Sequence, residues 1–254
     1  MIILKTSREI SIMREACKIS ANALKLAGEM VEPGVSTAKI DREVRRYIEK
    51  MGATPSFLGY EGMAGPFPAS SCISVNEVVI HGIPSEEQIL KEGDIVDIDI
   101  GAHYKGYHGD NAWTYPCGAI SDESQKLLDT TKQCLFEGIN QARPGNRIGD
   151  IGHAVQEYAE ARGYSVVRDF VGHGVGANLH EDPSVPNYGT PHRGVRLLAG
   201  MVIAIEPMIN EGVYTVKVLP DQWTTVTTDG KLSAHFEHTI AITSDGPVIM
   251  TVSD

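Results

Sequence analysis

The sequence has few cysteines, few aromatic residues and no long hydrophobic run. Its four cysteines are scattered and form no C-x-x-C pair; they are Cys17, Cys72, Cys117 and Cys134. Scattered cysteines in a chain of 254 residues indicate reduced thiols. The most apolar stretch, 200–208, contains Glu206 and is too short to span a bilayer. These absences exclude a disulfide framework and a transmembrane helix.

Positive charge is also scarce. The chain has 22 Lys and Arg against 33 Asp and Glu, which gives a formal net charge of −11. Nucleic acids and anionic membrane surfaces both attract clustered Lys and Arg. The first residues, 1–18, lack the apolar centre of a signal peptide. We therefore expect a cytoplasmic protein without a direct nucleic-acid or membrane partner, and a monomer because no coiled-coil pattern is present.

Four amphipathic helices are predicted, in two pairs. The first begins at a capping box formed by Thr6 and Glu9, and the third begins near Ser121. The second and the fourth each follow a Pro-Gly pair and end before a glycine. Six identities share an offset of 111 positions: Pro33/Pro144, Gly34/Gly145, Ile40/Ile151, Val44/Val155, Tyr47/Tyr158 and Gly52/Gly163. Chance can make two such helices look alike, but six matches at one offset favour a duplicated half.

Eight strands are predicted from apolar or alternating stretches: 72–75, 78–80, 95–101, 111–115, 166–170, 201–208, 223–227 and 234–243. They dominate the second part of each half, which suits antiparallel sheets with helices on one face. We predict an α+β chain with a single catalytic domain over 1–254. Its halves cover roughly 6–115 and 121–243, with a site where their sheets meet.

Carboxylates occur in strands that are otherwise apolar. In the run IVDIDIG, Asp97 and Asp99 share one face. Asp110 begins a strand that can pair with this run as a hairpin and lie beside Asp99. A solvent-facing strand would show the same alternation, but Glu206 and Glu237 lie in apolar strands without Lys or Arg. Burying an unpaired carboxylate costs several kcal/mol, so a divalent cation is the economical partner.

Histidines complete the candidate set. His173 lies between glycines in GHGVGANLHEDP, His180 follows seven residues later, and His81 ends an apolar strand. Each of them alone is typical of an ordinary polar contact. Four carboxylates and one imidazole together favour two divalent ions with bridging carboxylates, which is hydrolase chemistry. No role is predicted for His103, His192 and His235.

Five motifs give the sequence a resemblance to the short bacterial type I methionine aminopeptidases. They are SCISVNEVVIHGIP, GDIVDIDIGAHYKGYHGD, VGHGVGANLHEDP, IEPM and FEHT, in the family's order and over essentially the whole chain. The resemblance implies the pita-bread fold, in which two pseudo-symmetric helix–helix–antiparallel-sheet halves surround a dinuclear metal centre. This agrees with the offset of 111 residues found from the sequence alone.

The resemblance also implies roles for the metal site. The ligands would be Asp99, Asp110, His173, Glu206 and Glu237, holding two divalent ions of Mn, Fe, Co or Zn. Asp99 would chelate one ion, while Asp110 and Glu237 would bridge both. Glu206 would serve in addition as general base toward a metal-bridging hydroxide that attacks the scissile carbonyl.

The implied substrate is the initiator methionine of nascent polypeptides, removed when the second residue is small. His180 would stabilise the scissile carbonyl and its oxyanion, and His81 would contact the amide nitrogen or the leaving amine. A methionine side chain needs a narrow apolar slot. The residues implied for this slot are Tyr60, Cys72, Trp223 and Phe57. Proximity to the ribosome is left open.

Two features depart from the family pattern. The segment 59–72 is longer than the usual link, and Leu179 precedes His180 where a bulkier aromatic is common. Both touch the predicted slot and therefore bear on substrate preference. The alternative functions are an X-Pro aminopeptidase or dipeptidase of the same fold, and a non-catalytic pita-bread binding protein. The first usually has an added N-terminal domain, and the second tends to lose metal ligands, all five of which are present here.

Overall fold

The computed structural model describes residues 1–62 and 65–254. Over these ranges the chain forms four helices, α1 (Ser7–Glu29), α2 (Thr37–Lys50), α3 (Asp122–Gln141) and α4 (Ile148–Glu160). Thr6 and Glu9 form the predicted capping box of α1, and Ser121 caps α3. Before α2 and α4, Gly34 and Gly145 have φ of 91° and 98°. These values cost little only for glycine, so the two helix pairs are entered through similar turns.

The strands form antiparallel sheets, two of which are larger than the rest. The first contains β1 (Thr54–Pro55), β4 (Cys72–Val75), β6 (Ile95–Tyr104) and β7 (Tyr107–Pro116). The second contains β9 (Gly172–Gly174), β10 (Glu181–Val185), β11 (Val202–Ile205), β16 (His238–Thr243) and β17 (Gly246–Ile249). One smaller sheet has β8 (Ser165–Val166), β12 (Met208–Asn210) and β15 (Ser233–His235), and another has β5 (Val78–Ile80), β13 (Val216–Val218) and β14 (Thr225–Thr227). The last pairs β2 (Glu61–Gly62) with β3 (Gly65–Pro66).

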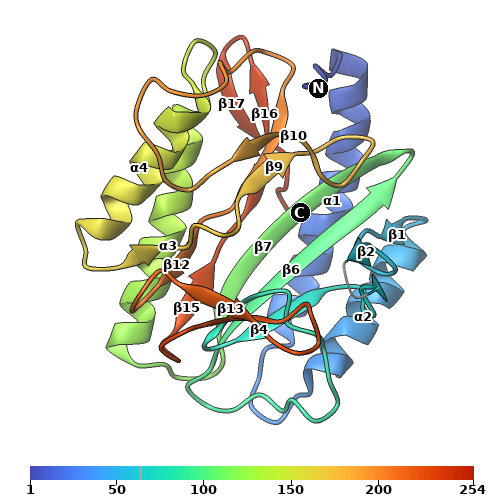
Figure 1. The fold of residues 1–254 in the computed structure, drawn as a ribbon. Coiled ribbons are helices and arrows are strands. Elements are labelled where there is room, and N and C mark those ends of the chain that lie inside the picture. The colour runs from blue at the N-terminus through green and yellow to red at the C-terminus, as the bar shows by residue number, and fades with distance from the viewer. Residues whose placement is uncertain (63–64) are drawn as a thin grey trace.

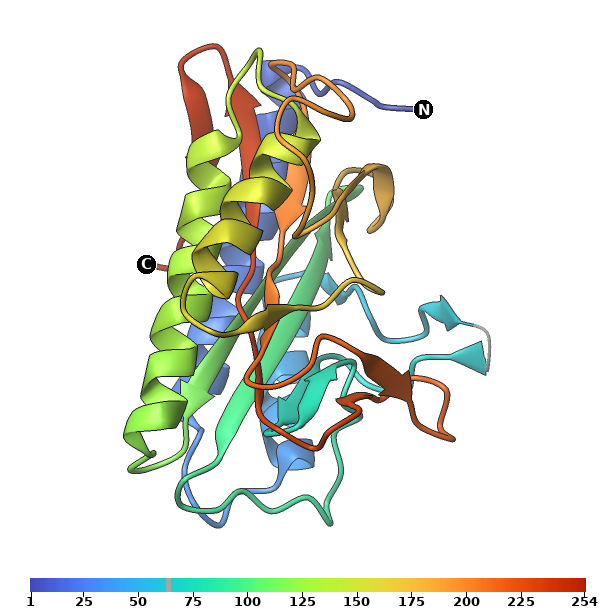
Figure 2. The same ribbon diagram turned by 60° about the vertical axis from the view of Figure 1, so that its left-hand side comes forward.

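Seen from the side, the helices lie toward one face of the molecule, and strands β2 and β3 project from the opposite face (Figure 2). Helix α1 runs behind the long hairpin β6–β7, and α3 and α4 lie beside each other (Figure 1). This arrangement confirms the predicted α+β chain with helices on one face. Among the described residues, no helix combines the length and the apolar character needed to cross a membrane.

Apolar packing against the helices leaves the charged side chains of β6 on the other face of its sheet. Val96, Ile98 and Ile100 of β6 are buried in an apolar cluster with residues of α1 and α2. A second apolar cluster joins α3 and α4 to β11 and β16. Since successive side chains of a strand point to opposite faces, Asp97 and Asp99 point away from α1 and α2. The alternation in IVDIDIG therefore places both aspartates on the face opposite the helices.

Two strands predicted as continuous are interrupted, and both interruptions contain a glutamate. The predicted strand 201–208 is split into β11 and β12 at Glu206 and Pro207, and 234–243 is split into β15 and β16 at Phe236 and Glu237. Pro207 has no N–H group for the ladder. Because β11 pairs with β16 and β12 with β15, the two breaks face each other. The prediction of unbroken strands was therefore wrong where the five-stranded sheet passes into the small sheet of β8, β12 and β15.

Two other predicted strands are shorter in the structure. The predicted strand 166–170 reaches only Val166 in β8, and the predicted strand 223–227 begins at Thr225. Phe170 and Trp223 therefore lie outside the strands, and both line the cavity described below.

Candidate active site and metal centre

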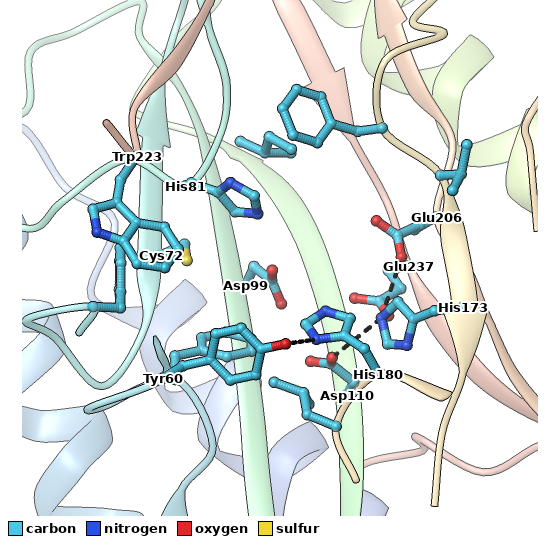
Figure 3. A pocket seen from close by; sticks show the side chains of 16 residues that line it. Tyr60, Cys72, His81, Asp99, Asp110, His173, His180, Glu206, Trp223 and Glu237 are labelled. Atoms are coloured by element: carbon cyan, nitrogen blue, oxygen red, sulfur yellow. Dashed lines mark hydrogen bonds and ion pairs between the residues drawn. The ribbon is translucent and has the colours of Figure 1, made fainter. Parts of the chain in front are cut away.

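A cavity of about 170 Å³ brings the predicted site residues together (Figure 3). Every side chain predicted for catalysis, metal binding or substrate binding lines it: Phe57, Tyr60, Cys72, His81, Asp99, Asp110, His173, His180, Glu206, Trp223 and Glu237. Leu179, noted as a departure from the family pattern, lines it as well. Phe67, Ile80, Phe170 and Val171 complete the lining without having been predicted. Positions separated by up to 180 residues of sequence thus share one small volume.

The hairpin β6–β7 places two carboxylates on one wall. Asp99 is opposite Ala112 and Asp110 is opposite Gly101 in the ladder. Both aspartates therefore lie on the same face, as diagonal neighbours two positions apart along the strands. The predicted hairpin is confirmed, and the proximity of its two aspartates follows from the diagonal instead of a direct cross-strand pair.

His173 and the carboxylates of both sheets form a compact cluster. One possible ligand atom from each of Asp110, His173 and Glu237 lies within 4.8 Å of the other two. His173 Nε2 is 3.8 Å from Asp110 Oδ2 and 3.5 Å from Glu206 Oε1. His173 Nδ1 donates to the Gly174 carbonyl at 2.9 Å. Nε2 then carries a lone pair that faces the carboxylates, which is the tautomer that a metal ligand requires.

The carboxylate oxygens of this cluster lack protein partners. Within residues 1–62 and 65–254, Asp99 Oδ1, Asp110 Oδ1 and Glu237 Oε1 are buried and accept no hydrogen bond. In the same part of the chain, the ion pairs of Asp110 and Glu206 involve histidine and neither Lys nor Arg. Buried carboxylates without partners are costly unless a cation or a proton neutralises them. Oxygen donors with one imidazole suit divalent transition ions, so these residues fit the metal centre that the resemblance implies.

Burial also controls the proton affinity of the cluster. It raises the pKa of Asp110 to about 7 and that of Glu206 to about 8. The pKa values of Asp99 and Glu237 are raised well above their usual range, first by burial and then by the neighbouring carboxylates. Without a cation, the cluster therefore holds protons near neutral pH, and ligand binding by a metal must displace them.

Two further histidines face the cavity. His180 Nδ1 lies 2.7 Å from the Tyr60 hydroxyl, and its ring packs 4.2 Å from that of His173 (Figure 3). His81 follows β5 with φ of 59°, a left-handed conformation that few histidines adopt. Burial lowers the pKa of His81 to about 4 and also lowers that of His180. Both rings are therefore neutral at pH 7 and can each donate one hydrogen bond.

The opposite wall is apolar. Phe57, Phe67, Cys72 and Leu179 form a buried cluster against which Trp223 packs. The Phe67 and Trp223 rings meet edge to face, with centroids 5.1 Å apart. Burial raises the pKa of the Cys72 thiol well above its usual range, so this cysteine is a neutral wall residue, as predicted.

The two walls are joined through the sheet. Cys72 on β4 is directly opposite Asp99 on β6. The long segment 59–72 contributes Tyr60 and Phe67 to the cavity, while its residues 63 and 64 lie outside the described residues. Phe67 was not predicted, although a phenylalanine between two prolines (PFP) in this segment could have indicated it as a lining residue.

The sequence analysis missed a buried pair behind Glu206. His235, which is 1% exposed, lies with Nδ1 3.4 Å from Asp97 Oδ2 and with Nε2 3.9 Å from Glu206 Oε2. Burial opposes protonation of His235, but the neighbouring carboxylates, Asp97 first, together outweigh it and raise the pKa of the ring. The signals in the sequence were that Asp97 shares a face with Asp99 and that His235 stands two residues before Glu237.

Known proteins resemble this chain over its whole length. Metallopeptidase family M24 matches residues 11–244. The chain is 55% identical to methionine aminopeptidase 1 of Bacillus subtilis, over 99% of both chains, and 54% identical to a methionine aminopeptidase of Clostridium perfringens, again over 99% of both. The crystal structure of a methionine aminopeptidase from Thermotoga maritima superposes with a TM-score of 0.95 at 46% identity, over 99% of both chains. A prolidase from Pyrococcus horikoshii superposes with a TM-score of 0.80 at 25% identity; all of this chain is covered, and 65% of the prolidase.

Proposed function

The chain belongs to metallopeptidase family M24 and has the pita-bread fold of the methionine aminopeptidases. From this premise we propose that it removes the initiator methionine of nascent polypeptides when the second residue is small. It is a metal-dependent aminopeptidase by this relationship. The observation that carries the proposed substrate is the junction of the two walls. Cys72 and Asp99 are paired across the sheet, so an apolar slot begins where the carboxylate cluster ends.

The proposed metal ligands are Asp99, Asp110, His173, Glu206 and Glu237. Three of them, Asp99, Asp110 and Glu237, have a buried oxygen that accepts no hydrogen bond from the described residues, and His173 donates from Nδ1, so that Nε2 carries a lone pair. Both observations support this assignment. Asp110 and Glu237 belong with His173 to the compact group of ligand atoms, and we propose that both would be shared if two ions of Mn, Fe, Co or Zn are bound. Divalent ions bound there would polarise the scissile carbonyl and lower the pKa of a water molecule.

Glu206 is the proposed general base. Its side chain is almost buried, and Oε1 faces the cluster at 3.5 Å from His173 Nε2. A carboxylate whose pKa is raised toward neutral can take a proton from the attacking water and later give it to the leaving amine. Burial raises the pKa of Glu206 to about 8 in the metal-free protein. This environment supports the role better than an exposed carboxylate would.

His180 and His81 are proposed to contact the scissile amide from two sides. If the Tyr60 hydroxyl donates to His180 Nδ1, then Nε2–H of His180 faces the cavity. That N–H can stabilise the carbonyl oxygen as negative charge develops on it. His81, neutral at pH 7, can hydrogen-bond with the amide nitrogen or the leaving amine.

The apolar wall is the proposed slot for the methionine side chain. Phe57, Tyr60, Cys72 and Trp223 supply the predicted contacts, and Phe67 adds one that was not predicted. The flexible thioether of methionine suits a narrow slot lined by rings and a sulfur atom. We further propose that the protein acts as a monomer in the cytoplasm. The whole chain is proposed to be one catalytic domain, whose halves, roughly 6–115 and 121–243, arose by duplication.

The test compares two substrates on metal-stripped protein. Met-Gly-Met-Met and an X-Pro dipeptide are incubated with the protein while Mn, Fe, Co or Zn is added back. Metal-dependent release of free Met from the first substrate alone is expected. The similarity in fold to a prolidase makes X-Pro cleavage the second candidate. Cleavage of the X-Pro bond would replace the proposal, and no turnover with any metal would favour a binding protein.

A further inference from the structure

The carboxylate of Glu206 lies between two imidazole rings. Its Oε1 is 3.5 Å from His173 Nε2, and its Oε2 is 3.9 Å from His235 Nε2. His173 belongs to the compact group of ligand atoms with Asp110 and Glu237. The two oxygens of Glu206 therefore have different surroundings, since one faces the cluster and the other faces His235.

Two residues that face each other across strands β6 and β7 contact His235, one at its ring and one at its backbone. Asp97 on β6 is directly opposite Thr114 on β7. Asp97 Oδ2 faces Nδ1 of the ring at 3.4 Å. The Thr114 hydroxyl donates to the backbone carbonyl of His235 at 2.7 Å, and the backbone N–H of His235 donates to Thr114 Oγ1 at 3.0 Å. The hairpin thus fixes both the ring and the backbone of His235, a residue of the other half of the chain.

Nε2, the second nitrogen of this ring, points toward Glu206. In the part of the chain that the structure describes, His235 Nε2 is buried and makes no hydrogen bond. A buried ring nitrogen without a hydrogen-bond partner costs about 1–3 kcal/mol. Oε2 of Glu206, at 3.9 Å, needs to move by less than about 1 Å to accept a normal hydrogen bond. Contacts of this kind are often long in free enzymes and shorten when the site is filled.

We propose that His235 is a positioning residue for Glu206. Held by Asp97 and Thr114, its ring contacts Oε2 of Glu206 through Nε2, with one proton shared between the two groups. This contact turns Oε1 toward His173 and the other metal ligands, where a proton must be accepted. The inference rests on the proposed function, because it concerns how the general base is held and assigns no separate reaction.

Two substitutions of His235 separate this role from simple filling of space. The amide nitrogen of glutamine lies near the position of Nε2, and that of asparagine near the position of Nδ1. His235→Gln therefore keeps a donor for Glu206, while His235→Asn keeps only the contact with Asp97. Replacing an outer partner of a metal-site residue typically costs about 10–100-fold in activity.

We expect His235→Asn to lower kcat for Met-Gly-Met-Met about 10–100-fold with little change in KM, and His235→Gln to stay within about threefold of wild type. Metal content after dialysis should be the same in both variants and in wild type. Equal losses in the two variants would assign His235 a structural role only. Full activity of His235→Asn would overturn the proposal.

A second measurement needs no turnover. In metal-free protein labelled with ¹⁵N-histidine, Glu206→Gln should shift the His235 Nε2 resonance, and Asp97→Asn should shift Nδ1. An Nε2 resonance that Glu206→Gln leaves unchanged would refute the contact even if the His235 variants do not fold. Absence of methionine release by wild type would contradict the proposed function, whereas this spectrum reports on the contact alone.

Discussion

Two aspartates of the polar wall and three aromatic residues of the apolar wall lie on different kinds of backbone. Asp99 and Asp110 lie inside the ten-residue strands β6 and β7, where hydrogen bonds on the ladder fix their positions. The apolar wall takes Tyr60, Phe67 and Trp223 from segments between strands, and Tyr60 is 38% exposed. Strand positions hold charges more rigidly than connecting segments hold apolar side chains. Changes in the polar wall should therefore affect chemistry and metal binding, and changes in the apolar wall should affect substrate binding.

The largest effect should come from Glu206→Gln on the polar wall. The substitution keeps the shape of the side chain but removes the proton acceptor, so kcat should fall by about 1,000-fold. Steady-state hydrolysis of Met-Gly-Met-Met under saturating metal measures it, with circular dichroism to verify the fold. Glu211→Gln, at an exposed position, is the matched control. A kcat near that of wild type would remove Glu206 from the role of base.

Asp110→Asn should weaken metal retention by roughly 100-fold, because it removes one negative charge from the compact group with His173 and Glu237. Equilibrium dialysis with Mn or Co, followed by elemental analysis, gives the stoichiometry and Kd. The exposed Asp129→Asn on α3 should behave as wild type. Unchanged stoichiometry in the Asp110 variant would count against a shared ligand at this position.

The metal-free protein should become more stable as the pH falls from 8 to 6.5. Burial raises the pKa of Glu206 from 4.5 to about 8 and that of Asp110 from 3.8 to about 7. Over this window the folded carboxylates take up protons that the unfolded ones do not, whereas the unfolded chain takes up part of the protons of four buried histidines. The free energy of unfolding therefore rises by about 1 kcal/mol. The four histidines, whose pKa burial lowers, are His81, His108, His173 and His238. The contribution of the carboxylates is complete below the unfolded pKa values and is lost as the pH rises through the folded ones. Urea denaturation at a series of pH values measures it.

Two conditions sharpen this pH prediction. Below pH 6.5 the trend should weaken, because burial lowers the pKa of His81 to about 4 and that of His173 to about 3, and the unfolded chain then takes up the extra protons. Saturating metal should reverse the trend, because metal binding requires deprotonated ligands. A flat profile in the metal-free protein would contradict the view that the carboxylates hold protons in the fold.

Phe67→Leu on the apolar wall should have the smallest effect. Loss of the edge-to-face contact with Trp223 widens the slot, so kcat/KM for Met-Gly-Met-Met should fall by about tenfold, mainly through KM. Metal affinity should stay unchanged. Phe136→Leu, outside the cavity, controls for the loss of an aromatic ring elsewhere. A drop in metal affinity would show that the two walls are not independent.

Local patterns in the sequence account for most of the site. The capping box at Thr6 sets the start of α1, and the alternation in IVDIDIG sets the face on which Asp97 and Asp99 lie. Glu206 and Glu237 were predicted from charge within apolar strands, and both line the cavity. The breaks at these two glutamates were not predicted, because an apolar run extends across each of them.

By itself, the sequence determined which residues have the chemistry of a metal centre and which face of each strand they occupy. Only the tertiary structure decided which faces meet. Asp97 and His235 are far apart in sequence, and no role was predicted for His235. The periodicity of apolar residues predicts which face of a strand is buried. It does not predict which other strand lies against that face, because this depends on how the sheets pack together. That packing brings His235 against Asp97 and leaves its second nitrogen facing Glu206.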